Sequence, residues 1–202
     1  MKGILLLNGD PHAEEIDDKG ALVICCDGAY EWAKGRVRID KNVGDFDSLG
    51  YIPYPPPEQV YPSEKDFTDG EIALFKLFES GVDEIEIYGG GGGREDHFLG
   101  NLHLLHCAHK RGVKAKMITA RSIIFPASGR VNFNGIKGAT VSVFPFGREV
   151  HIICSTGLKY TYPNVLDYGV CRGVSNVVED ECARLDLGEG DTALIIINRG
   201  EV

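Results

Sequence analysis

Basic residues are scarce in this chain of 202 residues, which holds 21 lysines and arginines against 30 aspartates and glutamates. The formal net charge is −9. A broad surface for nucleic acid or anionic lipid needs clustered lysine and arginine to displace counterions, and this composition argues against one. We therefore expect small-molecule partners, with no nucleic acid and no membrane among them.

Long apolar runs are missing as well. The first run, at residues 3–7, is too short for a signal peptide and is followed at once by an Asn-Gly-Asp-Pro segment. No later run approaches the length of a membrane-spanning helix. The sequence predicts a cytoplasmic protein.

The six cysteines include no C-x-x-C pair, which is the spacing typical of zinc ligands and redox-active dithiols. A reducing compartment leaves such cysteines as buried side chains or surface thiols. We expect neither a disulfide nor a zinc site. With 43% hydrophobic and 25% charged residues, the composition is that of an ordinary globular protein.

Short apolar runs alternate with helical patterns up to about residue 119. The predicted strands are 3–7, 22–26, 84–88 and 115–119, and the predicted helices are 29–34, 69–80 and 96–111. Such alternation indicates a mainly parallel sheet covered by helices. We expect an α/β domain at residues 1–124.

The helical period disappears after residue 122. The predicted strands here are 140–144, 150–154, 158–162, 174–178, 183–187 and 193–198, and turn signals containing glycine separate them. We expect an all-β domain, an antiparallel sandwich or barrel, at residues 125–202.

A Gly-Asp-Phe-Asp-Ser segment at residues 44–48 is the first of two acidic groups. On an extended segment the carboxylates of Asp45 and Asp47 share one face, with Phe46 pointing the other way. Paired carboxylates suit a hard cation such as Mg²⁺. Taken alone, the segment is more typical of a turn closed by an Asx hydrogen bond.

A Lys-Asp-Phe-Thr-Asp segment at residues 65–69 forms the second acidic group. Thr68 and Glu71 form the pattern of a capping box, which is a sufficient explanation for both of them. It does not explain Asp66 and Asp69, which bring a second pair of carboxylates to a helix start.

Five consecutive glycines at residues 89–93 follow a predicted strand and lead into a helix. Such a run is usually a flexible loop, but backbone amides before a helix also bind phosphate. It does not match the G-x-x-x-x-G-K-[ST] pattern. Arg94 adds a bidentate phosphate ligand, whereas Asp96 and His97 allow a ribose contact, support of Arg94, proton transfer or simple helix-start hydrogen bonds.

An Asp-Gly pair, Asp27 and Gly28, stands where a predicted strand ends and a helix begins. In open α/β sheets this position commonly contacts ribose or phosphate. An ordinary strand-to-helix turn is an equal alternative.

Taken in order, these motifs resemble the thiamine pyrophosphokinase family. The matching segments are 27–28, 44–48, 65–69, 92–97 with Asn101, 157–160 and 173–176. The resemblance implies an α/β domain that handles ATP, a β domain that holds thiamine, and a homodimer. It implies Mg²⁺-dependent transfer of pyrophosphate from ATP to the thiamine hydroxyl, which gives thiamine diphosphate and AMP.

The resemblance also implies roles for individual residues. The metal ligands are expected to be Asp45, Asp47 and Asp69. With these three, the catalytic set contains Asp66 and Arg94. The expected ATP-binding residues are Asp27, Gly28, Thr68, Gly92, Gly93, Asp96 and His97. The expected thiamine-binding residues are Ser175, Asn176, Lys159 and Tyr160.

Two residues depart from the family pattern. Ala29 stands where the family commonly has a second glycine after Asp-Gly, and the only tryptophan, Trp32, lies in the N-terminal half. The aromatic partner expected for the thiazolium ring is therefore not identified.

Three other functions are alternatives, although a non-catalytic sensor would be expected to lack part of the carboxylate set. A pyrophosphokinase of the same fold would act on another alcohol, and a non-catalytic sensor would bind thiamine or nucleotide without releasing AMP. A magnesium phosphohydrolase would use water as the nucleophile and need no alcohol.

Overall fold

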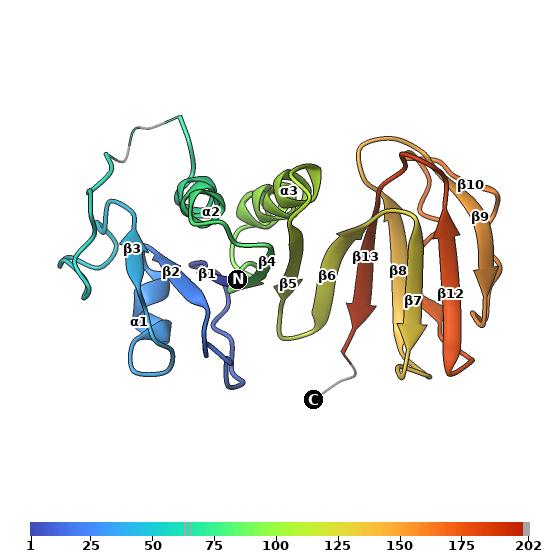
Figure 1. Cartoon of the computed structure of the whole chain (residues 1–202), viewed down its shortest axis with the longest axis horizontal. Coiled ribbons are helices and arrows are strands. Elements are labelled where there is room, and N and C mark those ends of the chain that lie inside the picture. The colour runs from blue at the N-terminus through green and yellow to red at the C-terminus, as the bar shows by residue number, and fades with distance from the viewer. Residues whose placement is uncertain (63, 65, 200–202) are drawn as a thin grey trace. The chain divides into compact units, whose positions relative to one another are not determined.

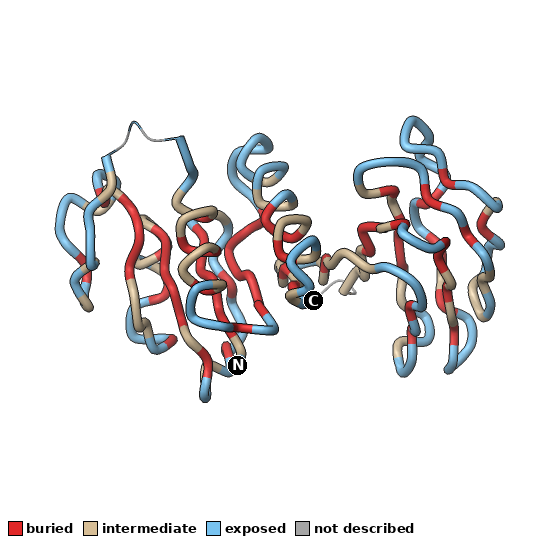
Figure 2. Tube along the Cα trace, turned by 45° about the horizontal axis from the view of Figure 1, so that its top comes forward, coloured by how far each residue is buried: buried red, intermediate tan, exposed pale blue. Residues whose placement is uncertain are grey.

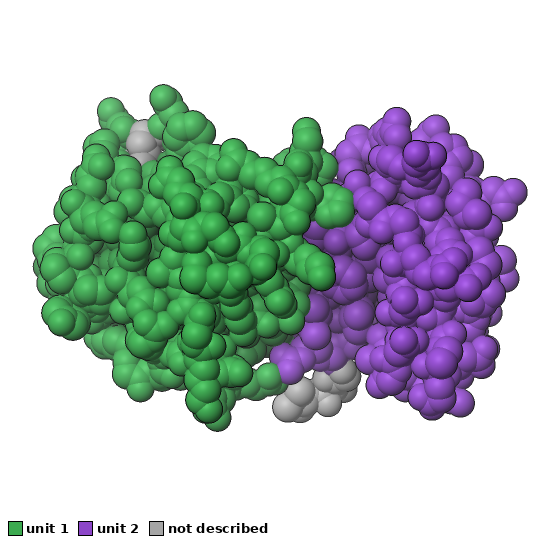
Figure 3. Space-filling model, in the orientation of Figure 1, with its two compact units in different colours: residues 1–120 green, residues 121–202 purple. Residues whose placement is uncertain are grey.

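The computed structural model describes residues 1–62, 64 and 66–199, so Lys65 of the second acidic segment lies outside the described residues. The chain divides into two compact units, Met1–Ala120 and Arg121–Val202 (Figure 3). The domain boundary was expected between residues 124 and 125. The first strand of unit 2 spans this position, because it extends from Ser122 to Ala127. In the described part of the chain, no helix is long and apolar enough to cross a membrane.

Unit 1 alternates strands and helices (Figure 1). Its strands are β1 (Lys2–Leu6), β2 (Leu22–Cys26), β3 (Lys41–Val43), β4 (Glu84–Tyr88) and β5 (Lys114–Ile118). Its helices are α1 (Ala29–Ala33), α2 (Asp69–Glu79) and α3 (Glu95–Lys110). Every pairing within the order β5-β4-β1-β2-β3 is parallel, which confirms the predicted sheet type.

Helices cover both faces of this sheet (Figure 1). Ile4 and Leu6 of β1 face α1 and pack with its buried alanines. On the other face, Gly3 lies against Leu77 of α2. This alternation follows from the pleat, because successive strand residues point to opposite faces. Figure 2 shows that buried residues follow the strands of the unit 1 sheet.

The predicted capping box fixes the start of α2. Thr68 Oγ1 accepts a 3.2 Å hydrogen bond from the Glu71 amide, and the Thr68 amide donates a 2.9 Å bond to Glu71 Oε2. The box satisfies two backbone donors at the helix start, which would otherwise lack partners within the helix.

Unit 2 is antiparallel throughout. Its strands are β6 (Ser122–Ala127), β7 (Arg130–Asn134), β8 (Thr140–Pro145), β9 (Val150–Thr156), β10 (Val165–Leu166), β11 (Asn176–Val177), β12 (Cys182–Leu187) and β13 (Ala193–Asn198). One sheet has the order β11-β8-β13-β6 and the other β10-β9-β12-β7. Buried side chains of both sheets, among them Phe133, Val143, Leu185 and Ile195, form one core. The predicted antiparallel β domain is confirmed, and its form is a sandwich.

Two predicted strands of unit 2 are wrong in extent. Residues 158–162 form no strand, because the backbone N–H and C=O of Tyr160 both bond to the side chain of Asn176. Leu158 keeps only an isolated bridge to Val178. The strand predicted at 174–178 is reduced to β11, since Ser175 has a φ of 58° and leaves the extended conformation.

Candidate functional site

Four loops of unit 1 lie at one edge of the sheet. They follow β1, β2, β3 and β4, whose carboxyl ends meet there because the strands are parallel. The chain passes from β1 to β2 and β3 on one side and returns to β4 on the other, so β1 and β4 flank a topological switch point. Ligands of open α/β sheets bind at such a point.

The glycine loop is tied to the segment that follows β1. The amides of Gly9 and Asp10 donate 2.8 Å hydrogen bonds to the carbonyls of Gly89 and Gly91. Asn101 of α3 binds the Gly90 carbonyl at 2.9 Å. These bonds hold the buried start of the loop, whereas Gly92 and Gly93 are exposed with φ values of 70° and 66°.

Two polar side chains at this edge were not predicted as site residues. A Cβ atom on Gly92 would lie 1.9 Å from Asp10 Cγ, and one on Gly28 would lie 2.5 Å from Asn8 Nδ2. Asn8 and Asp10 are therefore packed against glycines of two predicted motifs. The available signal was the polar Asn-Gly-Asp-Pro segment directly after a buried strand, which was interpreted only as the end of an apolar run.

Asp27 lies in the left-handed region with a φ of 43°, directly after β2. Its Oδ2 accepts a 2.9 Å hydrogen bond from Ser48 Oγ of the first acidic segment. Its Oδ1 is buried and has no hydrogen-bond partner among the described residues. A buried carboxylate oxygen without a donor is unfavourable, and a ligand or cation at this position would relieve it.

The first acidic segment is a turn and not an extended strand. Phe46 has a φ of 59° and is 3% exposed, so it anchors the turn in the core. The Asp47 amide donates a 3.1 Å bond to Asp45 Oδ1. Asp45 is partly buried and Asp47 is exposed. The turn therefore presents carboxylate oxygens beside Asp27.

The second acidic segment reaches the same edge through the start of α2. Cys26 Sγ, at the end of β2, contacts the Asp69 carbonyl at 3.5 Å. Asp69 is partly buried, and Asp66 and Thr68 are exposed. The Thr68 hydroxyl is engaged in the capping box.

The described residues contain no preformed group of three or more acidic, histidine or cysteine side chains that could hold a metal ion. Magnesium at nucleotide sites is commonly held by one or two carboxylates together with substrate phosphates. The carboxylate oxygens of Asp45 and Asp47 fit that requirement.

Arg94 precedes α3 at the end of the glycine loop and forms a two-point pair with Asp96. The distances are 3.1 Å from Nε to Oδ1 and 2.6 Å from an Nη atom to Oδ2. Asp96 Oδ1 also accepts the His97 amide at 2.9 Å. The Arg94 hydrogen bond lowers the pKa of Asp96, which stays ionised. Asp96 thus orients Arg94 at the mouth of the loop.

The four predicted thiamine residues lie together in unit 2. Asn176 is 2% exposed, and both ends of its amide bond to the Tyr160 backbone, at 2.9 and 2.7 Å. Lys159 Nζ lies 5.4 Å from the centre of the Tyr160 ring. The Ser175 amide binds Ser142 Oγ at 3.0 Å. Ser175 and Tyr160 present exposed side chains, while Asn176 holds the segment in place.

Both units match family models. Residues 13–117 match the model described as thiamin pyrophosphokinase, catalytic domain, and residues 128–190 match thiamin pyrophosphokinase, vitamin B1 binding domain. A thiamine pyrophosphokinase of Bacillus subtilis (strain 168) is 36% identical over 129 residues, and the alignment covers 60% of this chain and 60% of that relative.

Solved structures share the fold over almost the whole chain. The crystal structure of thiamine pyrophosphokinase from Bacillus subtilis has a TM-score of 0.80 and 26% identity, with 99% of both chains covered. The thiamin pyrophosphokinase from Geobacillus thermodenitrificans has a TM-score of 0.78 and 23% identity, covering 99% of this chain and 98% of that one. With the catalytic-domain model spanning residues 13–117, the chain belongs to the thiamine pyrophosphokinase family.

Proposed function

We propose that this protein transfers the pyrophosphoryl group of ATP to the hydroxyl of thiamine, giving thiamine diphosphate and AMP. One observation carries the proposal: the turn with Asp45 and Asp47, the buried oxygen of Asp27, and the glycine loop with Arg94 follow strands whose carboxyl ends meet at one sheet edge. This is the set of groups that a magnesium-bound triphosphate requires.

The reaction forms one phosphorus–oxygen bond and breaks another. The thiamine hydroxyl oxygen attacks the β-phosphorus of ATP, the bond from that phosphorus to the α-phosphate oxygen breaks, and AMP departs with the electron pair. The hydroxyl proton passes to a carboxylate of the site. The protein must align attacking and leaving oxygens and neutralise charge on the triphosphate.

Residues of unit 1 divide this work. Asp45, Asp47 and Asp69 would hold Mg²⁺, which neutralises phosphate charge when bound. Asp66 and Thr68, at the start of α2, support the phosphates or the thiamine hydroxyl. Arg94, held by Asp96, contributes a fixed positive charge to the transferring group. The AMP portion is assigned to Asp27 and Gly28 and to the exposed end of the loop, Gly92, Gly93 and His97.

Residues of unit 2 bind the acceptor in this proposal. The exposed Ser175 hydroxyl and Tyr160 ring, with Lys159, contact thiamine. The amide of Asn176 is engaged with the Tyr160 backbone. We therefore assign Asn176 to positioning Tyr160, and assign the polar contact with the pyrimidine to Ser175.

The proposal includes a cytoplasmic location, where ATP and a reducing environment are present, and a homodimer of the kind the family resemblance implies. Light scattering of the purified chain measures its subunit number directly.

AMP formation from ATP and Mg²⁺, with and without thiamine, tests the proposed reaction. We expect AMP and thiamine diphosphate, identified by mass, in equal amounts and only when thiamine is present. AMP or ADP without thiamine would indicate a hydrolase. No AMP, together with retained thiamine or ATP binding, would indicate a sensor, and AMP with another alcohol only would indicate a different acceptor.

A further inference from the structure

Trp32 stands near the end of α1 and is half-buried. Its indole Nε1 donates a 3.3 Å hydrogen bond to the carbonyl of Leu7, the residue directly after β1. This bond crosses from the helix to the loop that carries Asn8 and Asp10. The predicted motifs assign Trp32 no role.

The same ring lies against the first residue of the glycine loop. A Cβ atom on Gly89 would stand 3.0 Å from Trp32 Cζ2 and 2.1 Å from the Leu7 carbonyl oxygen. The Leu7 carbonyl and the indole edge therefore both pack against Gly89 and leave no room for a side chain there. The ring touches both loops at the topological switch point, through a hydrogen bond to one and packing on the other.

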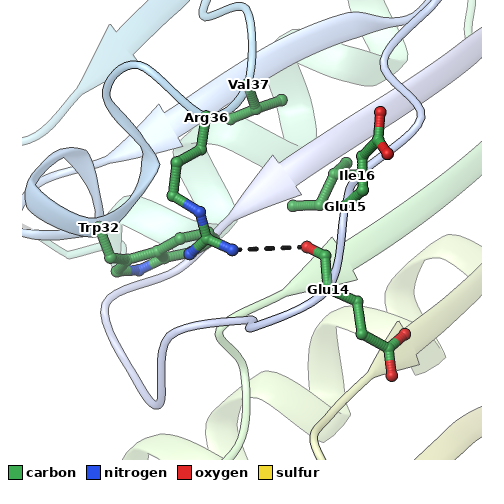
Figure 4. Close-up of a pocket in the computed structure, with 6 residues that line it drawn as sticks. All are labelled: Glu14, Glu15, Ile16, Trp32, Arg36 and Val37. Atoms are coloured by element: carbon green, nitrogen blue, oxygen red, sulfur yellow. Dashed lines mark hydrogen bonds between the residues drawn. The ribbon is translucent and has the colours of Figure 1, made fainter.

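The ring also lines a cavity of about 400 Å³ (Figure 4). Glu14, Glu15, Ile16, Arg36 and Val37 complete its lining. An Nη atom of Arg36 donates a 2.9 Å hydrogen bond to the carbonyl of Ala13, which ties the segment that carries residues 14–16 of the lining to Arg36. Phenylalanine is smaller than tryptophan, so at position 32 it removes the indole N–H and enlarges this cavity without introducing a clash.

We propose that Trp32 is a positioning residue for nucleotide binding. Its indole N–H holds the Leu7 carbonyl, and its ring supports Gly89, so that the paired loops 7–10 and 89–93 keep one relative register. That register places Asp10 beside Gly92 and presents the exposed end of the glycine loop. Since α1 begins directly after Asp27 and Gly28, the same side chain connects three of the four site loops. The proposal rests on the proposed function for its ligand, ATP.

The test replaces the indole with a ring that cannot donate a hydrogen bond, in Trp32→Phe. The matched control is Glu15→Gln, which alters the wall of the same cavity. In the described part of the chain, the Glu15 side chain forms no hydrogen bond or ion pair. Both full-length variants are assayed for KM of ATP, kcat, melting temperature and amide hydrogen exchange without ligand.

In Trp32→Phe we expect KM for ATP to rise about three- to tenfold, as the loss of one neutral hydrogen bond implies, with kcat changed less than twofold. The amides of Gly9 and Asp10 should exchange at least threefold faster, while those of unit 2 keep their rates. Glu15→Gln should match the unchanged protein in all four measurements.

Hydrogen exchange separates failure of this inference from failure of the proposed function. If the unchanged protein makes no thiamine-dependent AMP, the proposed reaction is wrong, and faster exchange of Gly9 and Asp10 in Trp32→Phe still supports the positioning role. Unchanged exchange at both amides overturns the inference whatever the activity. A KM equal to that of the unchanged protein, in an active enzyme, overturns it as well.

Discussion

Ser48 Oγ donates a 2.9 Å hydrogen bond to Asp27 Oδ2 and so joins the loops after β3 and β2. The bond fixes the carboxylate while its other oxygen stays buried and, among the described residues, without a donor. Asp27 is thereby held ready for a ligand at Oδ1. Its orientation depends on a residue of the neighbouring acidic segment.

Removing this support should weaken the site without unfolding the chain. In Ser48→Ala we expect kcat/KM for MgATP to fall about 10-fold, near the lower end of what lost supporting contacts cost. The melting temperature should stay within about 2 °C, since Ser48 is exposed. Steady-state kinetics and thermal melting measure both quantities. An unchanged kcat/KM would show that Asp27 needs no support from Ser48.

Asp47→Asn should separate chemistry from folding. Asp47 is exposed, so its change should alter the free energy of unfolding by less than about 0.5 kcal/mol. Turnover should fall at least about 100-fold at 1 mM Mg²⁺ if the carboxylate holds the metal, and part should return at higher Mg²⁺. Glu189→Gln, at an exposed turn of unit 2, is the control. Near-normal turnover in Asp47→Asn would exclude it as a ligand.

Arg94→Ala should lower kcat by about 100- to 1,000-fold, the range found when one stabilising donor of a transition state is removed. Arg94→Lys keeps the charge and loses the planar two-point geometry, so it should recover only part of the rate. Rapid-quench measurement of AMP release distinguishes the chemical step from binding. Equal kcat values in Arg94→Lys and the unchanged protein would show that the positive charge is sufficient and the planar geometry is not needed.

Ser175→Ala and Asn176→Ala should give different results. Ser175 is exposed, and its loss should raise KM for thiamine several-fold with an unchanged melting temperature. Asn176→Ala removes two bonds to the Tyr160 backbone and should destabilise the protein by about 1 kcal/mol for each. Urea unfolding and thiamine kinetics, measured on both variants, check this. A stable Asn176→Ala protein would contradict the structural assignment.

The environment of Asp191 predicts that part of the free energy of unfolding depends on pH. The residue is 2% exposed, and its Oδ2 accepts the backbone amide and faces the ring Nδ1 of His151, at 2.7 and 2.9 Å. Burial alone would raise the pKa of Asp191. The hydrogen bonds to His151 and the charge of Arg148 more than offset that effect, so the pKa lies below its ordinary value.

A lowered folded-state pKa stabilises the protein above the unfolded value of about 3.9 and loses that contribution as the pH falls through the folded value. Asp191→Asn should cost about 1–3 kcal/mol at neutral pH. It should also flatten the fall of the urea midpoint below about pH 4. Urea titrations from pH 7 to pH 3 measure this slope. An identical slope in both proteins would remove Asp191 from the acid response.

The fold class followed from periodicity because the long elements are locally consistent. Four strands of unit 1 and its two longer helices were predicted to within one or two residues, and the capping box of Thr68 and Glu71 is confirmed. β7 was missed although its polar and apolar residues alternate, which is a strand pattern. β3 was missed because it has only three residues, and β10 because it has two. A short pattern carries too little signal.

The details of the site depend on contacts that no local pattern contains. The first acidic segment allowed two forms, an extended one with Asp45 and Asp47 on one face and a turn closed by an Asx hydrogen bond. The structure has the turn, in which Phe46 adopts a left-handed conformation. The thiamine contact of Asn176 stays a prediction, and its hydrogen bonds to Tyr160, which lies 16 positions earlier, belong to no local pattern. The packing of Asp10 against Gly92 depends on the contact between the loop after β1 and the glycine loop, and no local pattern predicts that contact.

Three strands at sheet edges are also the shortest strands in the described part of the chain. β3 ends the unit 1 sheet with three residues, and β10 and β11 end the two sheets of unit 2 with two residues each. An exposed strand edge is a template on which another chain adds its own backbone, the first step toward fibrils. A longer edge strand, β7, carries Arg130, Asn132 and Asn134 on its outer face, where the polar side chains oppose such addition. The brevity of these three edge strands thus protects the folded chain from self-association through them.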